Sequence, residues 1–301
     1  MRDGAGGSDL SAPPIDENVD FALLRRIVHA RSQNVLDPSR DYVFEARLAG
    51  VIRGAGMSSL GELAAHLGRM RDPELECAVA DAMTINETSF FRDRRPFEVL
   101  RKEILPDLIE ARSGTRSLRM WSAACSTGQE AYSLAMLVRE HFPTLTNWRV
   151  QIEATDFSRE VLSRAKSGRY RRCEISRGLP VRLLARYFDE DGEEWVIKPE
   201  IRALCRFQWA NLAISPLPVH GPFDVILLRN VMLYFSPEAR STVMGQAHRL
   251  LAKDGALFLG SSEQPVDASR WTAAFSGGTS YFKWRCAGCE RNCNRRKCMA
   301  G

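Results

Sequence analysis

Residues 117–130 read SLRMWSAACSTGQE, and this stretch decides the fold. A run of mainly apolar residues ends at Ala124, small polar residues follow, and a helical pattern begins near Glu130. This order predicts a buried strand, a tight turn and a helix, which together hold nucleotides in parallel sheets. The turn has one glycine, Gly128, where a dinucleotide-binding turn has three, and the carboxylate of Glu130 would repel a phosphate. The sequence therefore predicts a nucleoside ligand without a phosphate.

The chain beyond Leu118 alternates between strand and helix patterns. Such alternation predicts an α/β fold, in which helices cover both faces of a mainly parallel sheet and the ligand lies at the carboxyl ends of the strands. The predicted strands are 117–123, 148–155, 205–212, 223–229, 255–261 and 279–284, and the predicted helices are 129–141, 158–167 and 237–251.

Polar residues follow four of these strands, at Glu130, Asp156, Asn211 and Asn230. Because ligands bind at that edge of a parallel sheet, we expect these side chains to line the ligand site. Asp156 has two interpretations, since its carboxylate can accept hydrogen bonds from a ribose diol or cap the helix that follows. S-adenosylmethionine fits the predicted site, because its sulfonium and ammonium groups are positive and would be attracted by nearby carboxylates.

The composition is that of a globular protein. With 301 residues, 45% of them hydrophobic, the chain is long enough for one large domain and a small one. No run approaches the roughly 18 apolar residues that span a membrane, and the N-terminus lacks the apolar core of a signal peptide. We therefore expect a cytoplasmic protein that is not inserted in a membrane.

Positive charge is concentrated in one part of the chain. The net charge is +5, and between Arg164 and Arg186 there are eight basic residues and one acid, Glu174. Two interpretations remain open: a solvated surface near a domain boundary, or a surface that binds an acidic partner.

Cysteine is concentrated at the C-terminus. Four of the eight cysteines lie in the stretch CAGCERNCNRRKC, at Cys286, Cys289, Cys293 and Cys298. A CxxC pair followed by two more thiols can bind zinc, but these spacings differ from those of the usual paired knuckles. The sequence leaves two alternatives open, a metal site or a reduced, disordered basic tail.

Six motifs carry a resemblance to a known family. They are NETSFFRD (86–93), MWSAACSTGQEAYSLAM (120–136), ATDFS (154–158), NL (211–212), RNVMLYF (229–235) and GTSYFKW (278–284). In this order and spacing they resemble the chemoreceptor glutamate O-methyltransferases, the CheR family. The resemblance runs from about Phe21 to Trp284. It implies an enzyme that transfers a methyl group from S-adenosylmethionine to glutamate side chains of methyl-accepting chemotaxis receptors. The products would be glutamate methyl esters and S-adenosylhomocysteine, formed in chemosensory adaptation.

The resemblance also implies a domain organisation. A small all-helical domain precedes a Rossmann-like S-adenosylmethionine methyltransferase domain, which has a mainly parallel sheet and a small antiparallel subdomain. The expected parts are a disordered tail at 1–18, the helical domain at 19–84, a linker and cofactor-closing segment at 85–116, the methyltransferase domain at 117–285 with its antiparallel subdomain at about 170–206, and the tail at 286–301.

Site residues follow from the resemblance, motif by motif. Arg92 and Tyr234 would orient the attacking carboxylate through a guanidinium fork and a phenol. Glu130 would hold the amino acid end of the cofactor and Asp156 its ribose. The full set expected to bind the cofactor is Asn86, Thr88, Arg92, Glu130, Asp156, Asn211, Leu212, Asn230 and Val231.

The implied partner is the cytoplasmic helical bundle of chemoreceptors, along which the basic stretch at 164–186 would lie. Tethering to a receptor's C-terminal pentapeptide is in doubt, because the segment 186–199 is short and has one glycine and five acids between Asp189 and Glu194. Two alternatives from other classes are a nucleic-acid methyltransferase and a non-catalytic adapter. The position after the fourth strand lacks the paired prolines typical of enzymes that methylate exocyclic base nitrogens, so no nucleic acid is expected, and the presence of both Arg92 and Tyr234 argues against an adapter.

Overall fold

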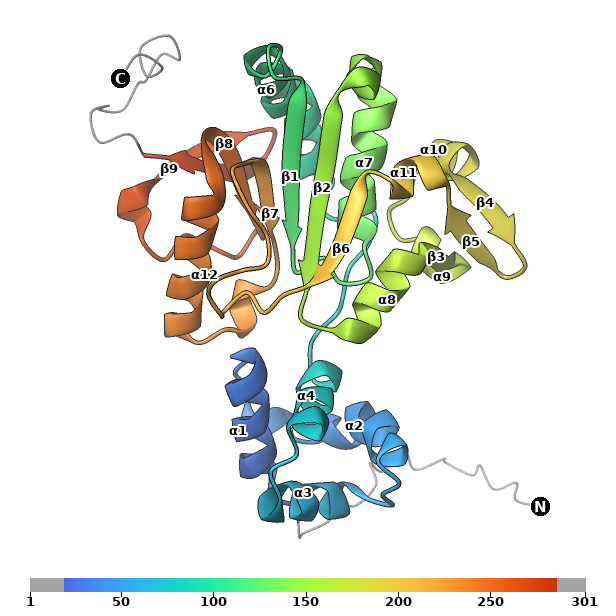
Figure 1. Ribbon diagram of the computed structural model, residues 1–301, viewed down its shortest axis with the longest axis vertical. Coiled ribbons are helices and arrows are strands. Elements are labelled where there is room, and N and C mark those ends of the chain that lie inside the picture. The colour runs from blue at the N-terminus through green and yellow to red at the C-terminus, as the bar shows by residue number, and fades with distance from the viewer. Residues whose placement is uncertain (1–18, 286–301) are drawn as a thin grey trace, which may run out of the picture. The chain divides into compact units, whose positions relative to one another are not determined.

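The computed structural model describes residues 19–285 (Figure 1). Within these residues the chain forms two compact units, and each is described by itself. The first comprises the chain up to Arg31 together with Leu36–Met83, and the second comprises Ser32–Val35 and the chain from Thr84 onward. The expected tails at 1–18 and 286–301 lie outside the described residues, and so does the cysteine stretch.

The first unit is helical, as the resemblance implies. Polar caps begin the helices at Leu60 and Pro73, because the side chain of Ser59 accepts a hydrogen bond from the N–H of Glu62 and that of Asp72 accepts one from Leu75. Apolar side chains from all of the longer helices, among them the fully buried Leu48, form one core. The helices are α1 (Phe21–Ser32), η1 (Pro38–Arg40), α2 (Val43–Gly54), α3 (Leu60–Arg69) and α4 (Pro73–Ala82).

The second unit is built on a seven-stranded sheet with the strand order β6-β2-β1-β7-β8-β10-β9 (Figure 1). The strands from β6 to β8 in this order are parallel, and β10 is antiparallel to both β8 and β9. The predicted α/β class with a mainly parallel sheet is confirmed. The strands are β1 (Ser117–Ala123), β2 (Arg149–Asp156), β6 (Cys205–Trp209), β7 (Phe223–Leu228), β8 (Leu251–Leu259), β9 (Trp271–Ser276) and β10 (Thr279–Trp284).

Helices cover both faces of this sheet. Side chains alternate between the two faces along each strand, so apolar residues on each face pack against a layer of helices. On β1, Leu118 and Met120 pack with one set of helices, whereas Trp121 and Ala123 pack with α12 on the other face. Within residues 19–285 no helix is long and apolar enough to cross a membrane. The helices of the large sheet are α5 (Arg95–Val99), η2 (Leu100–Ile104), α6 (Leu105–Ala111), α7 (Gln129–His141), η3 (Pro143–Asn147), α8 (Arg159–Ser167), η4 (Met232–Tyr234), α12 (Pro237–Leu250) and η5 (Ala268–Arg270).

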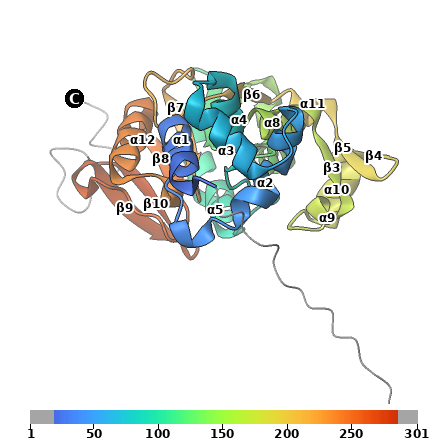
Figure 2. The same cartoon turned by 90° about the horizontal axis from the view of Figure 1, so that it is seen from below.

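A small antiparallel sheet follows α8, as expected from the resemblance. It has the order β3-β5-β4, and Figures 1 and 2 place it at the opposite end of the second unit from β9. Residues 205 and 206, expected in this subdomain, belong instead to β6, which pairs with β2 of the large sheet. The elements here are β3 (Arg169–Arg171), α9 (Arg172–Ile175), α10 (Val181–Tyr187), β4 (Phe188–Asp191), β5 (Glu194–Ile197) and α11 (Pro199–Arg202).

The strand ends differ from prediction where turn residues lie inside a strand. Strand β8 begins at Leu251, four residues before the predicted start at 255, although Lys253, Asp254 and Gly255 look like a turn. A register shift in the pairing with β7 accommodates them. Gly255 is required by this close approach, since a Cβ there would lie 2.8 Å from the carbonyl oxygen of Asp224. Strand β9 was not predicted.

Arg112, just after α6, ties the helical layer to the amino-terminal edge of the sheet. Its Nε donates to Asp224 at 2.8 Å, and its terminal nitrogens donate to both oxygens of Asp254 at 2.8 and 2.6 Å. The Asp224 side chain is 7% exposed and also accepts a hydrogen bond from the N–H of Arg119. Burial raises the pKa of Asp224, and Arg112 opposes that rise.

We expect Arg112→Ala to lower the free energy of unfolding by about 2–4 kcal/mol, because it leaves the Asp224 carboxylate buried without its cation. Urea denaturation followed by circular dichroism measures this loss. Lys102→Ala is the control, since it removes only an exposed ion pair with Glu98 and should change stability far less. Equal losses in the two variants would contradict the prediction.

Candidate functional site

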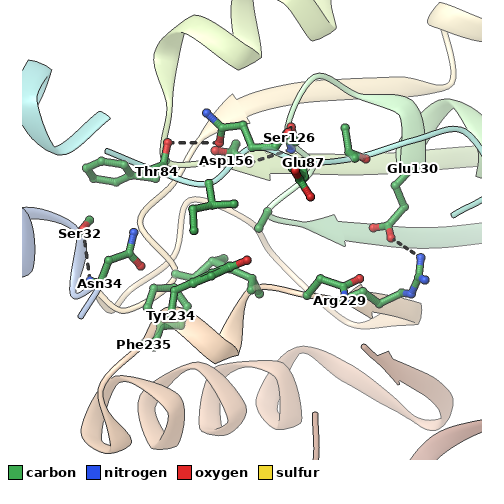
Figure 3. A pocket seen from close by; sticks show the side chains of 18 of the residues that line it. Ser32, Asn34, Thr84, Glu87, Ser126, Glu130, Asp156, Arg229, Tyr234 and Phe235 are labelled. Carbon is green, nitrogen blue, oxygen red and sulfur yellow. Dashed lines mark hydrogen bonds and ion pairs between the residues drawn. The ribbon is translucent and has the colours of Figure 1, made fainter. Parts of the chain in front are cut away.

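A pocket opens at the carboxyl ends of β1, β2 and β7, and all of its lining residues belong to the second unit (Figure 3). It borders about 820 Å³ of space that no protein atom fills, open solvent included. The ten residues expected to bind the cofactor or orient the substrate all line it: Asn86, Thr88, Arg92, Glu130, Asp156, Asn211, Leu212, Asn230, Val231 and Tyr234. The structure brings them together, and their individual roles stay predictions.

The turn between β1 and α7 forms the floor of this pocket. Ala124, Ser126 and Gly128 all have positive φ, at 59°, 50° and 93°. Only the last of them must be glycine, because a Cβ on Gly128 would lie 3.0 Å from the Cβ of Ala165. Burial raises the pKa of the Cys125 thiol well above its ordinary value, and nearby carboxylates add to the shift. This thiol therefore stays protonated and acts as a packing residue.

Asp156 ends β2 and is held by two backbone amides. Its carboxylate accepts hydrogen bonds from the N–H of Ser126 at 2.8 Å and from that of Ser158 at 3.0 Å. The side chain of Ser158, and not that of Asp156, caps α8 by accepting from the N–H of Val161. The cap interpretation of Asp156 is therefore wrong, and its carboxylate lines the pocket.

Glu130 lies in the first turn of α7, and its charge is paired inside the protein. Its carboxylate accepts a hydrogen bond from the hydroxyl of Ser122 at 2.7 Å and one from the guanidinium of Arg229 at 3.0 Å. Figure 3 shows Glu130 and Arg229 pointing toward one another at one end of the pocket. A buried carboxylate needs such partners because its desolvation is costly. Arg229 was not predicted as a site residue, although it lies directly before Asn230 in the RNVMLYF motif.

The segment 84–94 contributes another wall of the pocket. The Asn86 carbonyl accepts a hydrogen bond from the hydroxyl of Ser126 at 2.8 Å, which joins this segment to the floor. The guanidinium of Arg92 donates to the carbonyl of Glu87 at 2.8 Å and so turns back along its own segment. The ring of Phe90 is fully buried and anchors the segment in the core.

Glu263 fixes the backbone of the RNVMLYF motif. One of its carboxylate oxygens accepts hydrogen bonds from the N–H groups of Asn230 and Gly260, and the other accepts from those of Val231 and Met232, at 2.7 to 2.9 Å. The residue is 4% exposed, and Asn230 has a left-handed φ of 57°. Four amides on one carboxylate therefore hold two of the expected cofactor-binding residues. Sequence reasoning missed Glu263, because its partners are backbone groups.

Tyr234 ends the short helix η4, and Figure 3 shows it across the pocket from Asp156. Its carbonyl accepts a hydrogen bond from the N–H of Val35 at 2.7 Å, and Asn34 forms an isolated bridge with Phe235. The short segment 32–35 thus completes the pocket beside Tyr234. This contribution was not predicted, since no motif marks the segment.

These groups fit S-adenosylmethionine. The turn offers no nest of glycine amides for a phosphate, and three acidic residues line the pocket, Glu87, Glu130 and Asp156. Within the described residues, two buried polar atoms of the pocket-lining side chains have no hydrogen-bond partner, Nε of Arg229 and Oδ1 of Asn230. A ligand that offers both an acceptor and a donor would satisfy them, and the nucleoside and amino acid parts of S-adenosylmethionine offer both.

Comparison with known proteins agrees with this chemistry. Residues 86–281 match the family model described as CheR methyltransferase, SAM binding domain. The chain is 43% identical over 250 residues to chemotaxis protein methyltransferase 1 of Pseudomonas aeruginosa, covering 82% of this chain and 90% of that protein. It is 39% identical to chemotaxis protein methyltransferase Cher2 of Pseudomonas putida, with the same coverage.

A solved structure with a similar fold is a TehB-like SAM-dependent methyltransferase from Corynebacterium glutamicum. It is 13% identical, with 64% of this chain and 96% of that chain covered and a TM-score of 0.36, so no part of the assignment rests on it. The family match and the relatives of high identity and coverage are sufficient. The chain belongs to the CheR methyltransferase family, and it is an S-adenosylmethionine-dependent methyltransferase.

Proposed function

We propose that this methyltransferase esterifies glutamate side chains of methyl-accepting chemotaxis receptors. The observation that carries the proposal is that Arg92 and Tyr234, a guanidinium and a phenol, line the same pocket as Asp156 and Asn230. The same pocket thus has polar side chains suited to bind a nucleoside, Asp156 and Asn230, and side chains suited to bind a carboxylate, Arg92 and Tyr234. The names of the relatives, chemotaxis protein methyltransferases, support the same substrate class.

Cofactor binding is assigned to the residues of the floor and walls. Asp156 would accept hydrogen bonds from the ribose diol, and Glu130 would attract the ammonium of the amino acid end. Asn230 offers its free Oδ1 acceptor. The remaining contacts are assigned to Asn86, Thr88, Arg92, Asn211, Leu212 and Val231.

The substrate side needs orientation more than activation. A glutamate side chain has an ordinary pKa of about 4.3, so it is ionised at neutral pH and needs no general base. S-adenosylmethionine supplies a methyl group on a positively charged sulfur. In the proposed transfer, the carboxylate oxygen would form a bond to the methyl carbon while the bond from that carbon to sulfur breaks, and no proton would move. Arg92 and Tyr234 would hold the carboxylate in line for this displacement, and the buried floor would exclude water from it.

Only part of the basic stretch 164–186 carries positive charge that nearby acids do not offset, and only that part is proposed to bind an acidic partner. It is not one helix, since it runs through α8, β3, α9 and α10. Arg164 pairs with Glu174, Arg169 with Asp191 and Glu194, and Arg182 and Arg186 with Glu140. The exposed positive charge that these acids do not offset includes Arg171 and Arg172. We assign these two to the receptor's helical bundle.

The hairpin of β4 and β5 supports recognition without a pentapeptide tether. It turns at Gly192 and is rich in acids, two of which are engaged by Arg169. Receptor binding would then rest on the basic surface and the pocket mouth.

The experiment that tests the function is incubation of the enzyme with receptor-enriched membranes and S-adenosylmethionine labelled in its methyl group. Mass spectrometry should find methylated glutamates in receptor helices, and mild base should release the label as methanol. Base-stable label in nucleic acid, or label in no acceptor, would reject the proposal in favour of a nucleic-acid methyltransferase or an adapter.

Asp156→Ala should weaken cofactor binding about ten- to a hundredfold, because it removes a charge-assisted acceptor from the ribose. Calorimetry with S-adenosylhomocysteine measures this affinity. Glu160→Ala is a matched control, since it removes an exposed acid from the first turn of α8 outside the pocket. Unchanged affinity in Asp156→Ala would remove Asp156 from the binding site.

Tyr234→Phe should slow methyl transfer about a hundred- to a thousandfold and leave cofactor affinity almost unchanged. It keeps the aromatic ring and removes only the hydroxyl group, which would orient the carboxylate. Single-turnover rates at saturating cofactor and receptor give the measurement. Tyr187→Phe serves as the control, because that hydroxyl contacts Glu140 outside the pocket. A wild-type rate in Tyr234→Phe would show that Tyr234 is only a wall of the pocket.

Reversing Arg171 and Arg172 to Glu should raise the KM for receptor and leave the affinity for S-adenosylhomocysteine unchanged, because the two exposed charges face a partner and not the pocket. The matched control reverses Arg116 and Arg149, which are exposed at the amino ends of β1 and β2. If both double variants show the same KM as the wild type, the basic surface does not bind the receptor.

A further inference from the structure

Arg229 connects Glu130, at one end of the pocket, to the segment that carries Arg92. We propose that Arg229 is a positioning residue, which holds the backbone of Arg92 against Glu130 and thereby sets where the Arg92 guanidinium lies. This inference rests on the proposed function, because it takes Arg92 as the residue that orients the attacking carboxylate. It adds a residue that the family resemblance did not assign.

The contacts of Arg229 support this role. One terminal nitrogen donates to Glu130 at 3.0 Å, and the other donates to the carbonyl oxygen of Arg92 itself at 3.0 Å. The same second nitrogen forms an ion pair with the carboxylate of Asp93. The guanidinium also lies 6.0 Å from the centre of the Phe97 ring, within the range of a cation–π contact. The side chain is 2% exposed, so these partners take the place of water.

The segment that Arg229 holds has a backbone that needs outside support. Phe91, Asp93 and Arg94 have positive φ values of 48°, 65° and 44°, which are unfavourable for residues with side chains. Three such residues in four positions persist only if surrounding contacts determine them. Contacts that do so here include the hydrogen bond from the N–H of Phe91 to the hydroxyl of Ser133 at 2.9 Å and the Arg229 contacts at Arg92 and Asp93.

The geometry requires arginine at position 229. A planar guanidinium presents several N–H groups in a fixed fork, so it can reach Glu130 on one side and the Arg92 carbonyl on the other at once. A lysine ammonium keeps the charge but is a single point, and it cannot bridge both partners in this way. Arg229→Lys therefore keeps the positive charge at position 229 and removes the bridge between Glu130 and the Arg92 carbonyl.

The role predicts a specific pattern of defects in Arg229→Lys. The single-turnover rate should fall about ten- to a hundredfold, because a small displacement of an orienting group has effects of that size. Amide hydrogen exchange should become faster across residues 91–95, both with and without S-adenosylhomocysteine. Arg112→Lys is the matched control, since it disturbs another paired arginine at the opposite edge of the sheet. It should leave exchange at 91–95 and the rate as in the wild type.

A double-mutant cycle distinguishes positioning from a merely structural contribution. If Arg229 acts through Arg92, then Arg229→Lys should have little further effect on the rate in an Arg92→Lys background. Losses that multiply in the double variant would overturn the proposal, and so would wild-type exchange at 91–95 in Arg229→Lys.

A milder variant covers the case in which Arg229→Lys does not fold. Asp93→Asn weakens one contact at a side chain that is 48% exposed, so the fold should persist. We expect faster exchange at 91–95 and a smaller loss of rate, and no change in either would count against the role of Arg229. If the wild-type enzyme methylates no receptor, the proposed function fails, whereas the exchange measurements still decide whether Arg229 holds the segment.

Discussion

The rest of the structure depends on the burial of both faces of the parallel strands β2, β1 and β7. Such strands carry apolar side chains on each face, so polar groups gather where the strands end. In this protein the chain leaves those ends through the turn that contains Gly128, through Asp156 and through the RNVMLYF motif. The pocket therefore has a fixed place in the fold, and side chains from distant parts of the sequence share it.

Much of this could be predicted from the sequence. The predicted bounds of β1 and α7 agree with the structure, because an apolar strand, a turn of small residues and a helix that follow directly on one another give a strong local pattern. The strands β3, β4 and β5 were not located individually, since they have only three or four residues and several are charged. Short strands of this composition carry little periodic signal.

The unpredicted parts of the site have a common physical reason. The ion pair of Arg229 and Glu130 joins residues 99 positions apart, and Glu263 acts on backbone amides that every residue possesses. Neither has a spacing that a motif could record. The expected site residues line the pocket, whereas the residues that hold them in place became visible only in three dimensions. Both supporting groups are charged and buried, so each needs its protein partners to offset the cost of desolvation.

The passage of Ser32–Val35 through the second unit makes the two units discontinuous in sequence. The chain starts one unit, contributes four residues to the other and then returns to finish the first. A single cut near Met83 would therefore not separate two modules, because Asn34 would be removed from the wall beside Phe235. Exchange of the helical unit between homologous enzymes, in the laboratory or in evolution, must carry this strip along with the catalytic unit that it completes.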